Sequence, residues 1–229
     1  MILQKTKNYS PDKLNSIKQL SDYKDLVLQY APIENEYRYA LREMSAKLEN
    51  LDDYCQMRFA HNPIHHIESR IKTLDSIIEK IERRGYEPTL DNLRTYIYDI
   101  AGIRVVCKYI NDIYQIVDLL TKQKDLEIMI KKDYIVHPKD TGYRSLHIVF
   151  IIEIYVDDEI KKVPVEIQFR TLAMDMWACL EHELRYKSHN QLSITQQNEL
   201  KEYSSTLYNV DLNMQKIYIS TIVGDDDND

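Results

Sequence analysis

The chain has 229 residues, of which 44% are hydrophobic and 29% are charged, so it can bury the core of one globular domain. Its formal net charge of −7 argues against a general nucleic-acid binder, because affinity for phosphate backbones comes from cations. Neither a signal-peptide pattern nor an apolar run of membrane-spanning length occurs, so we expect a cytoplasmic protein without a membrane segment.

The three cysteines lie far apart in the sequence and match no zinc-binding spacing. Cys107 falls in an apolar strand and Cys179 in an apolar helix. We therefore expect buried, reduced thiols.

The first segment, residues 1–30, is weakly periodic, and we treat it as an N-terminal extension with a short helix over 11–30. From Pro32 to about Ala60, apolar residues recur at helical spacing and predict a long helix, and Pro32 suits its first turn. A second helix is expected over 63–84, with Gly85 at its C-terminal end.

The expected second helix carries both basic and acidic side chains. Its basic residues are Arg70, Lys72, Arg83 and Arg84. Four acidic residues nearly balance them, so a solvated helix face explains them as well as a binding site does.

A short helix from Thr89 to Tyr98 precedes the segment Asp99-Ile-Ala-Gly-Ile-Arg104. We expect Gly102 to turn the backbone into an apolar strand over 105–109. Asp99 ends one element just before a buried strand, where a carboxylate is either a metal ligand or a cap.

Asn111 or Asp112 can cap the next helix, which we expect to run through Lys124 and to lead into a strand over 126–130. This arrangement is a β-α-β element.

The stretch from Asp133 to Thr171 holds two β-rich runs, over 147–156 and 163–169, joined by a charged turn, and this pattern predicts an antiparallel hairpin. In the second run, apolar residues alternate with Glu166, Gln168 and Arg170. A solvent-facing row would explain these polar side chains without any function. The loop before the hairpin, however, also supplies an aromatic ring and cations, which together resemble a nucleotide site with a metal.

Two helices are expected after the hairpin, from Thr171 to Tyr186 and from Thr195 to Ser220. Trp177, on the first of them, is expected to anchor the core. The predicted fold class is α+β, with a central mixed β-sheet flanked by helices.

Four motifs stand in order along this chain: Asp99-Ile-Ala-Gly-Ile-Arg104, Gly142-Tyr-Arg-Ser-Leu-His147, Glu166-Ile-Gln-Phe-Arg-Thr171 and Trp177-Ala-Cys-Leu-Glu-His182. Together they resemble the synthetase domain of the RelA/SpoT family, and more narrowly its small alarmone synthetases. Each motif is short, but their order and intervals are specific. The resemblance covers about residues 35–190, so we divide the chain into 1–30, a synthetase domain over 31–190, and a C-terminal helix with an acidic tail over 191–229.

This resemblance implies a nucleotidyltransferase-like fold and Mg²⁺-dependent transfer of the β,γ-pyrophosphoryl group of ATP to the 3′-hydroxyl of GDP or GTP. The products would be AMP and guanosine tetra- or pentaphosphate. No His-Asp dipeptide of the kind used by the hydrolase domain of long family members occurs, so a synthetase without hydrolase is implied.

The same resemblance implies the roles of the catalytic residues. Asp99 and Glu166 match the two acidic positions that would hold Mg²⁺ through oxygen, and Glu166 would also accept the proton of the attacking hydroxyl. Gln168 would orient that hydroxyl or the metal shell, and Glu181 would support the site.

The nucleotide-binding residues are implied in the same way. Tyr143 would stack on the acceptor guanine, and the groups that would contact the acceptor phosphates are Lys132, Lys139, Arg144 and His147. Arg144 could instead hold its loop. The donor groups would be Arg70 and Arg104 around the adenine, with Lys72 and Arg83 on the triphosphate. Arg84 is an alternative to Arg83, and Arg170 is either a phosphate contact or part of an ion pair.

Further expectations concern assembly, regulation and alternative functions. Small family members often form tetramers through terminal helices, so we expect a homo-oligomer, while the acidic tail gives no positive signal for regulation by RNA. One alternative is a toxic relative that modifies the 3′ end of tRNA or an adenine nucleotide, which would need a basic surface. Another is a non-catalytic nucleotide- or RNA-binding regulator, which the presence of Asp99 and Glu166 disfavours.

Overall fold

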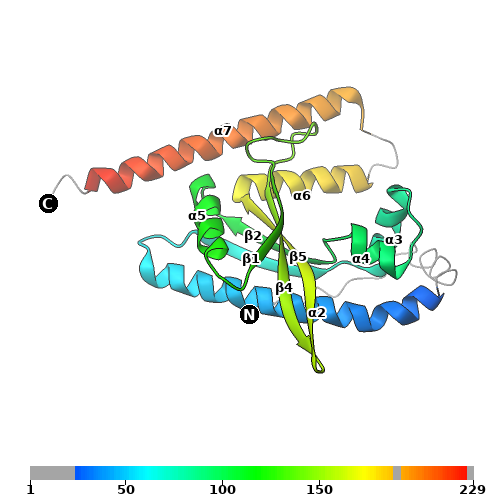
Figure 1. The fold of residues 1–229 in the computed structure, drawn as a ribbon. Coiled ribbons are helices and arrows are strands. Elements are labelled where there is room, and N and C mark those ends of the chain that lie inside the picture. Colours follow the sequence, from blue (N-terminus) through cyan, green and yellow to red (C-terminus); the bar gives the residue numbers. More distant parts are fainter. Residues whose placement is uncertain (1–23, 188–191, 226–229) are drawn as a thin grey trace.

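The computed structural model describes residues 24–187 and 192–225, in which a five-stranded mixed β-sheet lies between helices (Figure 1). The strand order is β1-β2-β5-β4-β3, with β2 and β5 parallel and the other neighbours antiparallel. The strands are β1 (Ile64–Ile71), β2 (Ala101–Cys107), β3 (Glu127–Asp133), β4 (Leu146–Val156) and β5 (Glu159–Thr171). The predicted α+β class with a central mixed sheet is confirmed.

Six helices surround this sheet in the described part of the chain. They are α2 (Lys24–Arg58), α3 (Leu74–Arg83), α4 (Leu90–Tyr96), α5 (Ile110–Thr121), α6 (Leu172–Lys187) and α7 (Ile194–Asp225). The expected helix over 11–30 falls mostly outside the described residues, and its last part belongs to α2.

The first long helix begins earlier than predicted. It starts at Lys24, so Pro32 lies inside α2 and not in its first turn. Proline removes one backbone hydrogen bond from a helix interior. Three residues around this position are buried, namely Leu26, Tyr30 and Ile33. Their packing stabilises the helix on both sides of Pro32, so the helix continues through the expected boundary at residue 30.

The predicted helix over 63–84 is wrong in its first part, which forms strand β1. Ile67 and Ile71 are spaced as on a helix, but this segment pairs antiparallel with β2 and lies at the edge of the sheet. The helix begins only at α3, where the side chain of Thr73 accepts the backbone N–H of Ser76. Gly85 follows the end of α3 with φ of 80°, as the C-terminal signal predicts.

Two other local predictions need correction. Gly102 does not turn the chain, since it lies within β2 and pairs with Arg70 and Glu166. Helix α5 begins after Tyr109, whose backbone N–H donates to the Asp112 carboxylate, so Asp112 caps the helix from inside its first turn. The N-cap itself is therefore neither Asn111 nor Asp112.

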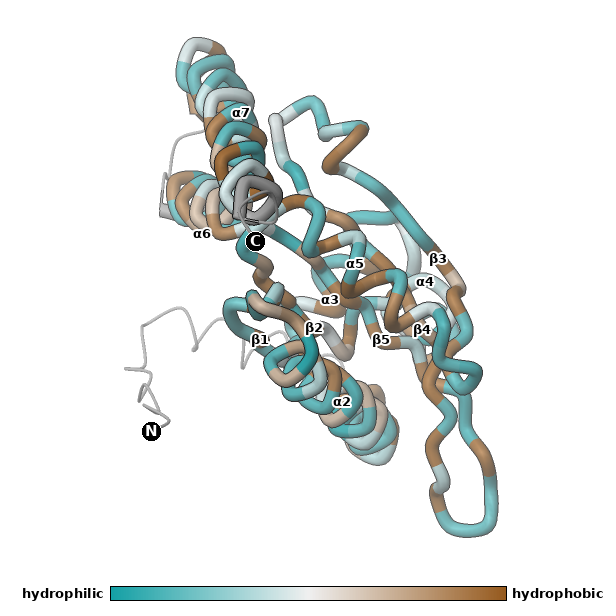
Figure 2. The backbone as a smooth tube through the Cα atoms, turned by 90° about the vertical axis from the view of Figure 1, so that its left-hand side faces the viewer, coloured by the Kyte–Doolittle hydropathy of each residue, from teal (hydrophilic) through white to brown (hydrophobic). Residues whose placement is uncertain are grey.

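The two faces of the sheet have different covers. Helix α2 runs along one face, and buried residues of α2 and α5 join the inward-facing residues of the strands in one hydrophobic core. Helices α6 and α7 lie over the opposite face (Figure 1). Figure 2 shows hydrophobic segments along the strands of the central sheet, and the residues of the core cluster come from these strands and from the helices against them.

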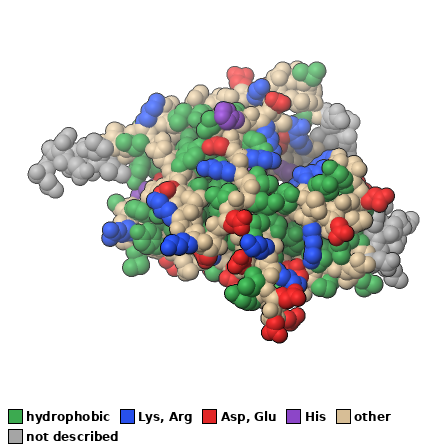
Figure 3. Space-filling view, viewed as in Figure 1, with side chains coloured by type: hydrophobic (Ala, Val, Ile, Leu, Met, Phe, Trp, Pro, Cys, Tyr) green, Lys and Arg blue, Asp and Glu red, His purple; other side chains and the backbone are tan. Residues whose placement is uncertain are grey.

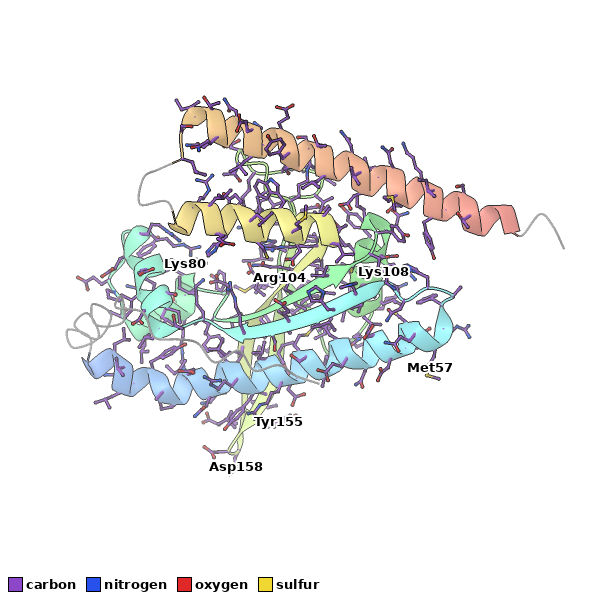
Figure 4. All side chains as sticks on the ribbon, turned by 180° about the vertical axis from the view of Figure 1, so that it is seen from behind. Met57, Lys80, Arg104, Lys108, Tyr155 and Asp158 are labelled. Carbon is purple, nitrogen blue, oxygen red and sulfur yellow. The ribbon has the colours of Figure 1, made fainter. Side chains whose placement is uncertain are left out.

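The hairpin of β4 and β5 continues beyond the sheet and projects past α2. Tyr155 and Asp158 mark its tip in Figure 4, and Figure 3 shows acidic side chains gathered at this end of the molecule. Backbone pairing continues to the pair Val156 and Glu159, and Asp157 in the turn has φ of 54°.

The cysteine prediction holds for two of the three residues. Cys55 and Cys107 are buried free thiols, whereas Cys179 is exposed on α6, where its sulfur lies 3.9 Å from Arg104 Nη1. Trp177 is buried as predicted, and its indole N–H donates to the Leu200 carbonyl. Among the described residues, no helix is long and apolar enough to cross a membrane.

Candidate active site

Strand β5 carries the polar row at the centre of the site. Its Glu166, Gln168 and Arg170 alternate with buried apolar residues and therefore point to the face opposite α2. Glu166 lies opposite Gly102 of β2, and Gln168 lies between Arg104 of β2 and His147 of β4. The sheet register thus places groups from β2 and β4 on the two sides of the same carboxylate and amide.

One cleft opens over β1, β2 and β5. Figure 4 shows Arg104 between α6 and the strands that form its floor. The residues that line the cleft are Glu68, Ser69, Arg70, Asp99, Gly102, Ile103, Arg104, Glu166 and Gln168. Arg70 and Arg104 come from neighbouring strands on the two sides of Gly102, which has no side chain to fill the space between them. The predicted donor arginines and both predicted carboxylates therefore meet in one cleft.

Asp99 is held by two lysines. Its Oδ2 accepts hydrogen bonds from Lys72 Nζ at 2.6 Å and from Lys80 Nζ at 2.7 Å. Burial raises the pKa of this carboxyl, but the two ammonium groups outweigh burial and lower the pKa to about 2. Its Oδ1 is buried and has no hydrogen-bond partner. Asp99 is thus an anion at neutral pH with one free oxygen.

Glu166 is held from the β4 side. Its Oε1 lies 3.2 Å from His147 Nδ1, and its Oε2 accepts from the Gln168 amide at 2.7 Å. Burial raises the pKa of Glu166, but the His147 and Gln168 contacts lower it by more, so the pKa falls below its usual value. The carboxylate is therefore kept ionised in a partly buried position.

A cluster of rings and cations lies beside β4. Tyr134, Tyr143 and His147 meet edge to face, and Lys139 Nζ lies 4.7 Å and 4.8 Å from the centroids of the two tyrosine rings. Burial lowers the pKa of Lys139, while the Glu166 charge opposes that shift. These groups can stack on a base and contact phosphate oxygens.

Hydrogen bonds in this cluster have a fixed direction. Arg170 Nη2 donates to the Tyr143 hydroxyl at 2.8 Å, because arginine has no acceptor. The Tyr143 hydroxyl lies 2.8 Å from His147 Nε2, and the other ring nitrogen faces the Glu166 carboxylate. A carboxylate only accepts, so His147 carries a proton on Nδ1, and in the neutral imidazole Nε2 accepts the Tyr143 proton.

Arg170 joins this cluster to the donor side. It is 6% exposed, and it also donates to Gln168 Oε1 at 2.9 Å and to Asp175 Oδ1 at 2.9 Å. Asp175, on α6, in turn forms an ion pair with Arg104 at 3.3 Å. Of the two roles left open for Arg170, the structure shows the ion pair.

The structure separates several predicted residues from the cleft. Arg83 is exposed on the last turn of α3, and Arg84 donates to the Tyr96 carbonyl, so neither lines the cleft. Arg144 donates to the Ile135 carbonyl at 2.6 Å and holds its loop, which was the alternative for this residue.

Two predicted residues lie close to the acceptor cluster without joining its hydrogen bonds. Lys132 is exposed on β3 and pairs with His147 across the strands. Glu181, on α6, is ion-paired with Arg185, and its charge acts on Lys139.

Two residues of the site were not predicted from the sequence. Lys80 reaches Asp99 from α3, and Asp175 joins Arg104 and Arg170 from α6. Neither lies in a motif position that singles it out. Lys80 is at helical spacing from Ser76 and Arg84, so only the position of α3 beside Asp99 reveals its role.

The carboxylates of Asp99 and Glu166 are the groups that could hold a divalent cation here. No group of three or more His, Cys, Asp or Glu side chains in the described parts of the chain is arranged to bind a metal. The free Oδ1 of Asp99 and the hard oxygen of Glu166 suit Mg²⁺, which is usually held by one or two carboxylates together with water and substrate phosphates.

Comparisons with known proteins show the family of the chain. Residues 69–191 match the model of the region found in RelA/SpoT proteins. The chain is 37% identical over 199 residues to GTP pyrophosphokinase YwaC of Bacillus subtilis, covering 87% of this chain and 95% of that protein. It is 34% identical to GTP pyrophosphokinase YjbM of the same organism, covering 79% and 84% of the two chains.

Solved structures show the same similarity. Small alarmone synthetase 1 from Bacillus subtilis, bound to its product pppGpp, superposes with a TM-score of 0.77 at 33% identity, covering 83% of this chain and 96% of that chain. Small alarmone synthetase 2 from the same organism gives a TM-score of 0.75 at 37% identity, covering 84% and 99%.

Proposed function

Because the chain belongs to the RelA/SpoT family and is a GTP pyrophosphokinase, we propose that it transfers the β,γ-pyrophosphoryl group of ATP to the 3′-hydroxyl of GDP or GTP. The products are AMP and guanosine tetra- or pentaphosphate. The observation that carries this proposal is the sheet register around Glu166, which has the Arg70–Arg104 cleft on its β2 side and the Tyr143–Lys139 cluster on its β4 side. Two nucleotides bound to these groups would meet at one carboxylate.

The donor nucleotide binds over β1 and β2. The guanidinium groups of Arg70 and Arg104 stack on the two sides of adenine, because planar cations suit the face of a base. Lys72 and Lys80 form ion pairs with Asp99 at the edge of the cleft. When ATP binds, their ammonium groups contact the triphosphate in place of the Asp99 carboxylate, because the triphosphate carries more negative charge. Arg83 is too far along α3 to line the cleft, so we assign the triphosphate contact to Lys80 in its place.

The acceptor nucleotide binds over the start of β4. The Tyr143 ring stacks on guanine, and Lys139 and His147 contact the 5′-phosphates. The acceptor's 3′-hydroxyl then lies beside Glu166, which is ionised and can accept its proton. Gln168 orients that hydroxyl, because its amide is fixed between Glu166 and Arg170.

We also propose that Asp99 and Glu166 hold Mg²⁺, as the donor set and the free Asp99 oxygen permit. When bound, this ion neutralises charge on the ATP phosphates and on the phosphorus under attack. Addition of a chelator should abolish product formation, and excess Mg²⁺ should restore it. Retention of activity in the metal-depleted protein would exclude this role.

A second part of the proposal concerns hydrolysis. No His-Asp dipeptide, of the kind used by the hydrolase domain of long family members, occurs in the sequence. We therefore propose a synthetase without alarmone hydrolase activity. Incubating the protein with guanosine tetraphosphate should leave that compound intact, whereas release of pyrophosphate would contradict the proposal. Assembly into a tetramer remains a prediction.

The transfer itself is tested by supplying ATP and Mg²⁺ with GMP, GDP, GTP, adenine nucleotides or deacylated tRNA in separate reactions. Anion-exchange chromatography should show AMP together with a guanosine 3′-diphosphate from GDP or GTP. Product only from tRNA or from an adenine nucleotide would overturn the acceptor assignment and favour the toxic branch of the family.

A further inference from the structure

The acceptor loop, residues 139–145, is covered by helix α7. Ser204 of α7 is buried and its hydroxyl donates to the Gly142 carbonyl at 2.5 Å. Gly142 has φ of 92°, and a Cβ atom there would lie 3.1 Å from Lys201 Cα and 3.1 Å from Ser204 Cβ. Only glycine therefore fits both this backbone conformation and the close approach of the helix.

A second contact lies on the other side of Tyr143. The Arg144 guanidinium lies 4.1 Å from the centroid of the Tyr208 ring on α7, within the range of a cation–π interaction. Its Nη1 donates to the Ile135 carbonyl at 2.6 Å, which ties the loop to the segment after β3. Both residues that flank Tyr143 in the sequence are thus held by α7.

Helix α7 is itself fixed to the body of the protein. Its Leu200 carbonyl accepts from Trp177, and its Asp211 carboxylate accepts from Thr171 at 2.5 Å. Further along, the Gln215 side chain accepts the backbone N–H of Asn111 at 2.8 Å. The helix is therefore tied to α5, β5 and α6 by contacts that do not involve the loop.

None of the described α7 contacts reaches the donor side. The hydrogen bonds and ring contacts of this helix go to the acceptor loop, to the end of β5, to α6, to the start of α5 and to the corner after α2. The match to the RelA/SpoT region ends at residue 191, before α7 begins. A role for this helix in the acceptor site is thus separate from the residues that define the family match.

We propose that α7 is a positioning element of the acceptor site, in which Ser204 and Tyr208 order the 139–145 loop before the acceptor nucleotide arrives. Ordering the loop in advance removes an entropy loss that binding would otherwise bear, so it raises acceptor affinity and leaves ATP affinity unchanged. The role of Tyr143 in acceptor binding rests on the proposed function, whereas the support of the loop by α7 does not.

The steady-state test replaces Tyr208 with Leu, which keeps an apolar side chain but removes the ring face under Arg144. We expect the KM for GDP to rise at least fivefold, while the KM for ATP stays within twofold of the wild type. Tyr208→Phe, which keeps the ring, should behave as the wild type. Ser204→Ala should raise the GDP KM by a smaller factor. Equal rises in both KM values, or an equal loss in Tyr208→Phe, would overturn the proposal.

The matched controls lie on the same helix. Tyr203 and Ser205 are both exposed, so Tyr203→Leu and Ser205→Ala change the same residue types without touching the loop. Both variants should keep wild-type KM values for both substrates. A rise in the GDP KM of the Tyr203 variant as large as that of Tyr208→Leu would show that the effect does not pass through Arg144.

Hydrogen exchange tests the loop without any acceptor. In Tyr208→Leu and Ser204→Ala, peptides covering 134–145 should exchange faster than in the wild type, while peptides covering 64–83 should not change. Unchanged exchange in 134–145 would overturn the proposal. If the wild type made no guanosine product, the proposed function would fail, and this measurement would still decide whether α7 supports the loop.

Discussion

The two sides of the cleft differ in how their side chains are held before substrate binds. On the acceptor side, Tyr143, His147 and Arg170 are joined by direct hydrogen bonds that continue to Glu166. On the donor side, no hydrogen bond or ion pair within the described residues holds Arg70, and Asp99 has an oxygen without a partner. The acceptor side is thus held by a continuous hydrogen-bond network, whereas Arg70 and one oxygen of Asp99 on the donor side have no partner among the described residues.

This difference has a consequence for mutagenesis. A change on the acceptor side should spread to its neighbours, because each group there holds the next. A change at Arg70 on the donor side should act on the bound nucleotide alone, since no hydrogen bond or ion pair of the described residues is lost with it, whereas Asp99 and Arg104 are held by ion pairs.

The largest effect is expected at the carboxylate between the two sides. Glu166→Gln keeps the shape of the side chain but removes both its charge and its basicity, so kcat should fall by about a thousandfold or more. The thermal midpoint should stay near that of the wild type, which circular dichroism can check. Substantial activity in this variant would mean that the proton and the metal depend on another group.

On the acceptor side, Tyr143→Ala should raise the KM for GDP by about ten- to a hundredfold, the loss expected for one base stacked on an aromatic ring. The KM for ATP should change little. Because the Tyr143 hydroxyl also bonds His147, kcat should fall as well, and Tyr143→Phe should reproduce that fall in kcat while the stacking is kept. An unchanged kcat in Tyr143→Phe would contradict the prediction that losing one hydrogen bond on the acceptor side also disturbs the neighbouring groups.

A matched pair of arginines compares the two sides directly. A lysine at position 170 cannot keep the hydrogen bonds to Tyr143, Gln168 and Asp175 together. Arg170→Lys should therefore lower the free energy of unfolding by about 2–3 kcal/mol. Arg70→Lys should leave stability unchanged and raise the KM for ATP by about tenfold. Denaturant unfolding and steady-state kinetics on both variants check this contrast, which a loss of stability in Arg70→Lys would contradict.

The smallest effect concerns acid stability. The lysines hold the pKa of Asp99 at about 2 in the folded protein, below the unfolded value near 4. Asp99 therefore contributes stability of about 2 kcal/mol above pH ~4, and this contribution is lost as the pH falls towards 2. Urea unfolding at pH 6 and at pH 3 should show a smaller difference between wild type and Asp99→Asn at the lower pH. Asp158→Asn serves as the control, because Asp158 is exposed and its φ is not positive.

The sequence predicted those parts of the fold in which local pattern and tertiary packing agree. The alternation in β5 and the helical spacing in α2 matched the structure, because both patterns are set by the core that they face. Strand β1 was mistaken for a helix because Ile67 and Ile71 fit either period. Pairing with β2 decides between the two, and no local signal reports that pairing.

The site was predictable where motifs carry its residues. Asp99, Arg104, Glu166 and Gln168, which lie in two of the motifs, do line one cleft, together with Arg70 from outside the motifs. Lys80 and Asp175 were missed because they reach the site through the placement of α3 and α6, which spacing along the chain does not encode. The helical assignment also misplaced Arg83, which would have shared a helix with Arg70 but lies on a separate element.

The projecting end of the β4–β5 hairpin bears on self-association. Strand β3 pairs with β4 only as far as Ile151, and β2 pairs with β5 only from Val165, so the ribbon beyond has two open edges. Its cross-strand pair Tyr155 and Ile160 is exposed, a combination that would invite edge-to-edge pairing with another chain. Charged residues surround that pair, namely Glu153, Asp157, Asp158, Glu159, Lys161 and Lys162. These charges oppose pairing of the ribbon with another chain and so protect the protein against aggregation.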